Sequence, residues 1–171
     1  MTDRVKSPAD DIVIRAATAS DRAFLDSLDE RLIGEAAVPG IDRARIEAFQ
    51  SAFTRAALDS TEPGACTLLA EDGNGRPLGY IHLEPTEDGL AREAAGYVSV
   101  IAVTAEAEGR GVAKRLLDAA EDWARAAGYR CLLLDVFASN ATARRFYERR
   151  GFSEDSLRLR RLVGRAPGEG A

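Results

Sequence analysis

Two glycines, Gly109 and Gly111, follow a β-branched run that ends at Val103, and an amphipathic helix pattern begins directly after them. This strand–turn–helix order builds an anion site. The first N–H groups of a helix have no partner within the helix, and the helix dipole adds partial positive charge there. Glycine also lets a phosphate approach the main chain closely. The sequence therefore predicts that a phosphorylated ligand binds at this turn.

The glycine pair alone leaves three interpretations open. An isolated G-x-G also occurs in tight turns that bind no ligand. A dinucleotide-binding fold is the second interpretation, because Asp135 follows the next strand pattern, where a ribose-binding acid is expected. Lys114 at the third glycine position and the long link over 104–108 weigh against it, and the absence of G-K-[ST] excludes a P-loop. A site for another phosphorylated cofactor is the third interpretation.

The residues downstream favour the third interpretation. The segment E-G-R-G-V-A-K-R-L-L at 108–117 resembles the coenzyme A pyrophosphate loop of the GNAT acetyltransferase superfamily, with the pattern Gln/Arg-x-x-Gly-x-Gly/Ala. The segment N-A-T-A-R-R-F-Y-E-R-R-G-F at 140–152 resembles the second signature of that family, Asn-x-x-Ala-x-x-Phe-Tyr-x-x-x-Gly-Phe. Both motifs, separated by the strand–helix–strand crossover expected over 96–136, indicate an N-acetyltransferase that uses acetyl-CoA as cosubstrate. The resemblance covers about residues 11–163.

The resemblance implies a coenzyme site along the strand and the loop. Main-chain groups on the strand should bond the pantetheine amides as an added strand would, and amides of the loop should hold the pyrophosphate. The residues expected to bind the coenzyme are Ile101, Val103, Glu108, Gly109, Arg110, Gly111, Val112, Ala113, Lys114 and Asn140. Glu108 stands where the family has Gln or Arg. Its carboxylate is mildly unfavourable beside a pyrophosphate, so we expect its N–H to donate instead.

Two residues of the second motif have implied roles at the reacting centre. Asn140 is the expected N-cap of its helix and, by resemblance, also faces the coenzyme. Tyr147 follows the core residue Phe146 and is turned by about 100° around the helix. In the family this tyrosine protonates the departing thiolate. A buried tyrosine with a purely structural role is the alternative.

The base for the reaction is harder to identify. The acceptor amine must lose a proton before it attacks the thioester, yet the strand over 96–103 contains no ionisable base. Glu93, directly before that strand, is the expected base, and His82, Glu84 and Asp135 are the other candidates. Direct attack in a ternary complex, without a covalent enzyme intermediate, is the expected mechanism.

Periodicity predicts the element order β-α-α-β-β-β-α-β-α-β around these residues. Strands are expected over 12–15, 66–70, 78–83, 96–103, 131–137 and 156–163, and helices from N-caps at Ser20 and Asp42, after Gly111 and from Asn140. A charged loop is expected over 84–95. The fold class is α/β (α+β), a GNAT-like mixed, mostly antiparallel sheet with one parallel β-α-β crossover and helices on both faces.

Composition limits the remaining possibilities. The 171 residues fit one domain over 11–163 with disordered segments at 1–10 and 164–171. A net charge of −5 disfavours nucleic acid, and no apolar run reaches the length of a membrane span. One histidine and two mid-strand cysteines predict no metal site, and a cytoplasmic location is expected.

The sequence contains no motif that specifies the acceptor of the acetyl group. The acceptor is expected to be a primary amine of a small molecule or a protein. A non-catalytic acyl-CoA-binding or regulatory module is the alternative function. A homodimer paired through the edge of the strand expected over 157–163 is also compatible with the sequence.

Overall fold

One five-stranded sheet organises this protein, as the computed structural model shows for residues 11–34 and 36–164. Its strands, in spatial order, are β1 (Ile12–Ala16), β2 (Cys66–Asp72), β3 (Pro77–Asp88), β4 (Glu93–Val103) and β5 (Leu132–Leu134). The first four strands pair antiparallel, and β5 pairs parallel with β4. The mixed, mostly antiparallel sheet with one parallel crossover is therefore confirmed.

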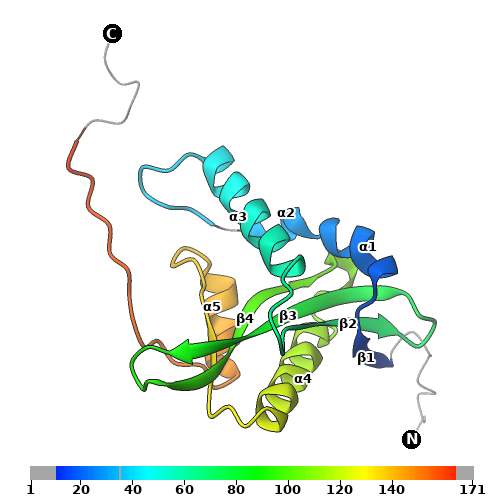
Figure 1. Cartoon of the computed structure of the whole chain (residues 1–171). Coiled ribbons are helices and arrows are strands. Elements are labelled where there is room, and N and C mark those ends of the chain that lie inside the picture. Colours follow the sequence, from blue (N-terminus) through cyan, green and yellow to red (C-terminus); the bar gives the residue numbers. More distant parts are fainter. Residues whose placement is uncertain (1–10, 35, 165–171) are drawn as a thin grey trace, which may run out of the picture.

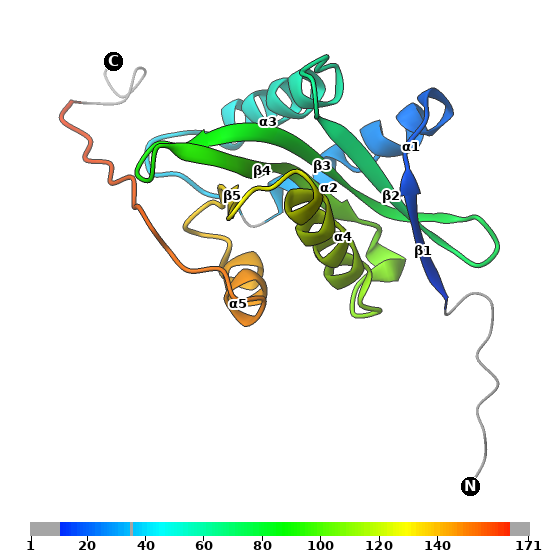
Figure 2. The same cartoon turned by 60° about the horizontal axis from the view of Figure 1, so that its bottom comes forward.

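Helices cover both faces of the sheet, as expected (Figures 1 and 2). On one face lie α1 (Arg22–Asp26), α2 (Asp29–Ile33) and α3 (Arg43–Leu58); on the other lie α4 (Val112–Ala126) and α5 (Ala141–Arg149). Short 3-10 helices, η2 (Ala19–Asp21) and η3 (Ala105–Ala107), precede α1 and α4. Alternate strand residues supply two separate cores: Leu69, Tyr80 and Val100 face α1–α3, and Ile81, Leu83 and Val98 face α4. We call these the α3 face and the α4 face.

The central helix α4 lies close against β4. Its buried stripe of Val112, Leu116 and Ala120 packs onto the α4 face, which is the helical spacing that the sequence predicts. A Cβ added to Gly96 of β4 would lie 2.6 Å from Cζ3 of Trp123. Glycine is needed at this position because the indole ring occupies the space of a side chain.

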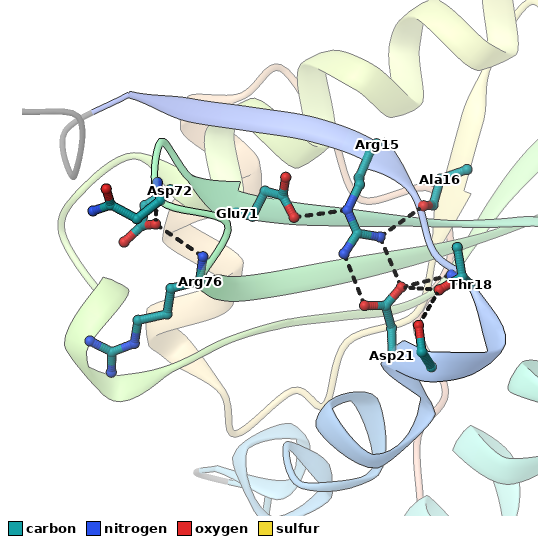
Figure 3. A network of polar contacts seen from close by, with 9 residues as sticks. Arg15, Ala16, Thr18, Asp21, Glu71, Asp72 and Arg76 are labelled. Carbon is teal, nitrogen blue, oxygen red and sulfur yellow. Dashed lines mark hydrogen bonds and ion pairs between the residues drawn. The ribbon is translucent and has the colours of Figure 1, made fainter.

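A polar network fixes the N-terminal edge (Figure 3). The Arg15 guanidinium on β1 donates from Nε to Glu71 at 2.8 Å and from Nη1 and Nη2 to Asp21 at 2.8 and 2.9 Å. The Asp21 carboxylate also accepts from the N–H and the hydroxyl of Thr18 at 2.7 and 2.9 Å. This network joins β1, β2 and the start of the first helical segment.

The same network corrects the predicted start of that segment. Thr18, not Ser20, is the N-cap, and the helix expected from Ser20 is divided into η2, α1 and α2. Asp42 does cap α3, since its side chain accepts from the N–H of Arg45 at 2.9 Å. On α3, Ile46 is buried, whereas Phe49 is 62% exposed.

Three other expectations about the chain are wrong. Most of the loop expected over 84–95 is strand, because β3 and β4 extend their antiparallel pairing to Asp88 and Glu93. The strand expected over 131–137 is reduced to Leu132–Leu134, and its residues are half-buried. No strand forms over 156–163, where Leu159 and Val163 are about nine-tenths exposed.

The described part of the chain begins at Asp11 and ends at Gly164. Residues 1–10 and 165–171, where disorder was expected, lie outside the described residues. Gly164 is described and belongs to no helix or strand. Within the described residues, none of the helices combines the length and the apolar character that a bilayer crossing requires.

Candidate active site

The sheet opens on one side of β4. Only Gly96, Tyr97 and Val98 pair with β5, whereas β4 remains paired with β3 as far as Val103. In the described part of the chain, no strand pairs with the other edge of residues 99–103. We call this edge the sheet opening. It exposes main-chain groups that an extended ligand can bond as an added strand would.

The glycine loop follows the sheet opening directly. Gly109 and Gly111 have φ of +72° and +81°, values that side-chain-bearing residues rarely adopt. Gly111 is the N-cap of α4 and no side chain caps this helix end. The first N–H groups of α4, from Val112 to Lys114, therefore point outward without intrahelical partners. Such N–H groups at a helix N-terminus can bind an anion.

Two of the expected amide donors are already used within the turn. The N–H of Glu108 donates to the carbonyl of Ala105 at 3.3 Å, and the N–H of Arg110 donates to the carbonyl of Ala107 at 3.2 Å. The N–H groups on the first turn of α4, from Val112 to Lys114, stay available to an anion.

A cavity of about 590 Å³ lies beside the loop. Three cationic side chains line it together with the start of β1; the lining residues are Asp11, Ile12, Val13, Arg110, Gly111, Lys114 and Arg115. Lys114 Nζ bonds Asp118 at 2.9 Å, and Arg115 donates to the carbonyl of Ile12 at 3.3 Å. The positive charge suits a further phosphate group next to the loop.

The Glu108 carboxylate points toward a cation. It forms an ion pair with Arg31 of α2, and the Nε of Arg31 also donates to the carbonyl of Val103 at 3.3 Å. Arg31 therefore spans the far end of the sheet opening. No local pattern indicates this contact, because the two residues of the ion pair lie 77 positions apart.

The helix α5 begins at its N-cap, Asn140, and brings Tyr147 to the α4 face. The Asn140 side chain accepts from the N–H of Ala143 at 3.0 Å, so its predicted capping role is confirmed. The Tyr147 ring packs against the rings of Phe146 and Phe152, with centroids 5.4 and 5.7 Å apart. Burial raises the pKa of Tyr147 to about 12, so the phenol keeps its proton at neutral pH.

Glu93 lies away from the sheet opening. It is the first residue of β4, pairs with Asp88 at the end of the long hairpin, and lies 3.7 Å from Arg130. Val98 lies five positions farther along the strand, a length of roughly 17 Å. The structure does not bring this expected base to the place where β4 and β5 part.

The other candidate bases do gather there, on the α3 face. His82 pairs with Val100, and Glu84 pairs with Tyr97. Tyr97 and Val100 lie on either side of Val98, the last residue of β4 that pairs with β5. The Tyr97 hydroxyl donates to Asp135 at 2.9 Å. Burial, and then this bond to a carboxylate, raise the pKa of Tyr97 above its usual range.

Comparison with known proteins agrees with this geometry. The acetyltransferase (GNAT) family model matches residues 35–152. YhfO of Bacillus subtilis strain 168, an uncharacterised N-acetyltransferase, is 34% identical over 105 residues, which are 61% of this chain and 68% of YhfO. The chain spans 29% to 47% of the length of three further curated relatives.

Solved structures share the fold. A Pyrococcus furiosus protein described as an acetyl transferase superposes with a TM-score of 0.72 at 22% identity, covering 90% of this chain and 100% of its own. AAC(6')-Iy, bound to the bisubstrate analogue CoA-S-monomethyl-acetylneamine, gives 0.62 at 18% identity, covering 90% and 99%.

The family match and the curated relatives identify an acetyl-transferring enzyme. The chain belongs to the acetyltransferase (GNAT) family, as its resemblance indicated. Members of this family use acetyl-CoA.

Proposed function

We propose that this protein moves the acetyl group of acetyl-CoA to a primary amine, of a small molecule or of a protein, by direct attack in a ternary complex. The single observation that carries this proposal is the continuity of the site. The sheet opening at residues 99–103 is followed along the chain by the short helix η3, the glycine loop and the uncapped N-terminus of α4. A ligand with an extended arm and a pyrophosphate fits that order of main-chain groups.

The coenzyme would follow this path with its two ends at different elements. The pyrophosphate would bind the N–H groups of Val112, Ala113 and Lys114, and the cationic cavity would take a further phosphate. The pantetheine amides would bond the main chain of Ile101 and Val103. Because Arg31 donates to the Val103 carbonyl in the structure described here, it would have to release this atom.

Tyr147 would act on the departing sulfur. The phenol carries a proton at neutral pH because burial raises its pKa to about 12. A thiolate leaves more readily when it receives a proton as the carbon–sulfur bond breaks. The tyrosine approaches from the α4 face, which leaves the α3 face of the sheet opening for the acceptor.

The test combines binding with turnover. Acetyl-CoA should raise the melting temperature, whereas NAD at the same concentration should not. Thiol release with a panel of primary amines should then exceed the rate of acetyl-CoA hydrolysis. Stabilisation without turnover by any amine would favour the acyl-CoA-binding module, and stabilisation by NAD alone would contradict the coenzyme assignment.

A further inference from the structure

A β-bulge lies at the sheet opening. Leu83 pairs with Val98 and His82 pairs with Val100, so Ser99 is an extra residue of β4. The Ser99 hydroxyl donates to the carbonyl of His82 at 3.3 Å. The strands β4 and β5 also separate at this position, because the pair of Val98 with Leu134 is the last one between them. The bulge therefore places one pair of side chains of β3 beside the sheet opening.

That pair is His82 and Glu84. Both lie on the α3 face, as does Tyr80, because residues two apart on a strand share a face. His82 is 3% exposed, and its Nδ1 lies 2.8 Å from the hydroxyl of Thr67. A hydroxyl can donate to or accept from this nitrogen, so Thr67 can hold the ring in either protonation state.

The other nitrogen of His82 is aimed at the carboxylate. Nε2 is buried, has no hydrogen-bond partner among the described residues, and lies 3.6 Å from Oε1 of Glu84. Burial lowers the pKa of His82, although the Glu84 carboxylate opposes this effect. The imidazole is thus neutral at pH 7 and can accept a proton. A buried polar atom without a partner costs free energy and calls for an explanation.

Glu84 connects this histidine to the surface. Its side chain is 24% exposed, and its partner across the sheet is Tyr97, whose hydroxyl bonds Asp135 beyond the end of β5. Acidic groups thus lie on both sides of the opening on the α3 face. This negative charge attracts an acceptor that carries an ammonium group. Tyr147 is on the opposite face, so proton acceptor and proton donor can act on two sides of one thioester.

We propose that Glu84 is the catalytic residue that takes the proton of a cationic primary amine acceptor, and that His82, held by Thr67, is the positioning residue that shares this proton. This proposal rests on the proposed acetyl transfer. The ammonium nitrogen gives one proton to the Glu84 carboxylate. The neutral nitrogen then bonds to the acetyl carbon while the carbon–sulfur bond breaks.

The electron pair of the broken bond stays on sulfur, which takes the phenol proton of Tyr147. The new amide nitrogen releases its surplus proton to water, and the phenolate regains one from water. Glu84 then returns its proton to solvent. The products are an N-acetylated amine, free coenzyme A and one proton.

The experiment compares Glu84→Gln with Glu87→Gln, a control that removes an exposed carboxylate farther along the same strand. With the best amine of the panel, Glu84→Gln should lower kcat/KM at pH 7 by about 100-fold. This loss of kcat/KM should become smaller as the pH approaches the pKa of the free amine, because more of the acceptor then binds in its neutral form. The control should keep its activity, and all variants should be stabilised by acetyl-CoA as the unaltered protein is.

His82→Gln tests the positioning role. It should lower kcat by about tenfold with an unchanged KM for acetyl-CoA, and adding it to Glu84→Gln should cause little further loss, because the two groups act as a unit. Full additivity, or a Glu84→Gln variant that keeps more than half of its activity at pH 7, would overturn this proposal alone. An unaltered protein that releases no thiol with any amine would contradict the proposed function itself, and this assignment with it.

Discussion

Tyr147 combines a packing role with the chemical role proposed for it. Its ring fills space between Phe146 and Phe152, and the same burial keeps the phenol protonated by raising its pKa to about 12. The sequence motif implied the chemical role, but the physical reason that the proton stays on the oxygen is the apolar packing.

Replacing Tyr147 by phenylalanine separates the two roles. Tyr147→Phe keeps the ring and removes only the hydroxyl, so kcat should fall by about 100-fold. The Kd for acetyl-CoA should change by less than threefold. Steady-state kinetics and calorimetric titration measure the two effects. A variant that loses coenzyme affinity along with turnover would show that the hydroxyl is needed for binding and not as an acid.

Glu108 is the position where this chain departs from the family pattern, and the ion pair with Arg31 offsets that departure. In the free protein the two charges largely compensate each other. A bound pyrophosphate would repel the carboxylate and attract the guanidinium, so the two residues should affect coenzyme affinity in opposite directions.

Glu108→Gln should therefore lower the Kd for acetyl-CoA by about threefold, because a repulsion near the surface costs about 0.6 kcal/mol. Arg31→Gln should raise the Kd, since it leaves the carboxylate uncompensated. Both effects should shrink in high salt. Titrations at two ionic strengths check this, and weaker binding by Glu108→Gln would contradict the assigned charge balance.

At the scale of elements, the local signals in the sequence predicted the parts that local contacts determine. Gly111 begins α4, and Asp42 and Asn140 cap their helices as predicted, because the cap residue and its partner lie three residues apart. These features need no knowledge of the rest of the fold.

Features that depend on distant residues were not predictable in the same way. The charged residues over 84–95 indicated a loop, but pairing between two strands made most of them a hairpin. The bulge at Ser99 follows from the register of β3 against β4, which no single segment encodes. Consequently the sequence could name Glu84 and His82 as candidates, but only the register places them at the sheet opening.

The Arg15 network makes the first helical segment sensitive to pH. Hydrogen bonds from Arg15, and then from the N–H of Thr18, hold the pKa of Asp21 far below its usual value of 3.8. A carboxylate with a lowered pKa in the folded state contributes stability above its unfolded pKa. That contribution is lost as the pH falls below about 4.

Asp21→Asn should therefore destabilise the protein by about 2 kcal/mol at pH 7, because it breaks charged hydrogen bonds at a largely buried site. The difference in melting temperature from the unaltered protein should narrow between about pH 5 and pH 2. Asp26→Asn, which removes an exposed ion pair with Arg22, is the matched control and should have a small effect. A constant difference across this pH range would show that Asp21 acts only through packing.

At the scale of the whole molecule, the sheet separates the two halves of the proposed reaction. The N-terminus of α4 and the phenol of Tyr147 lie toward one face, and His82 and Glu84 lie on the other. The two meet only where β4 leaves β5. Arg31 is the exception, because it extends from α2 on the α3 face to Val103 and Glu108.

Coenzyme binding should therefore change amide hydrogen exchange on both faces of the sheet. Acetyl-CoA should slow amide hydrogen exchange over 99–114 and also in α2, whose five residues connect to the site through Arg31. The turn over 72–76, where Asp72 accepts from the N–H groups of Asn74 and Arg76, should exchange at an unchanged rate. In Arg31→Gln the protection of α2 should disappear while that of the first turn of α4 persists. Protection of α2 that survives this substitution would mean that the coenzyme contacts the helix itself, and that Arg31 is not the link between the two faces.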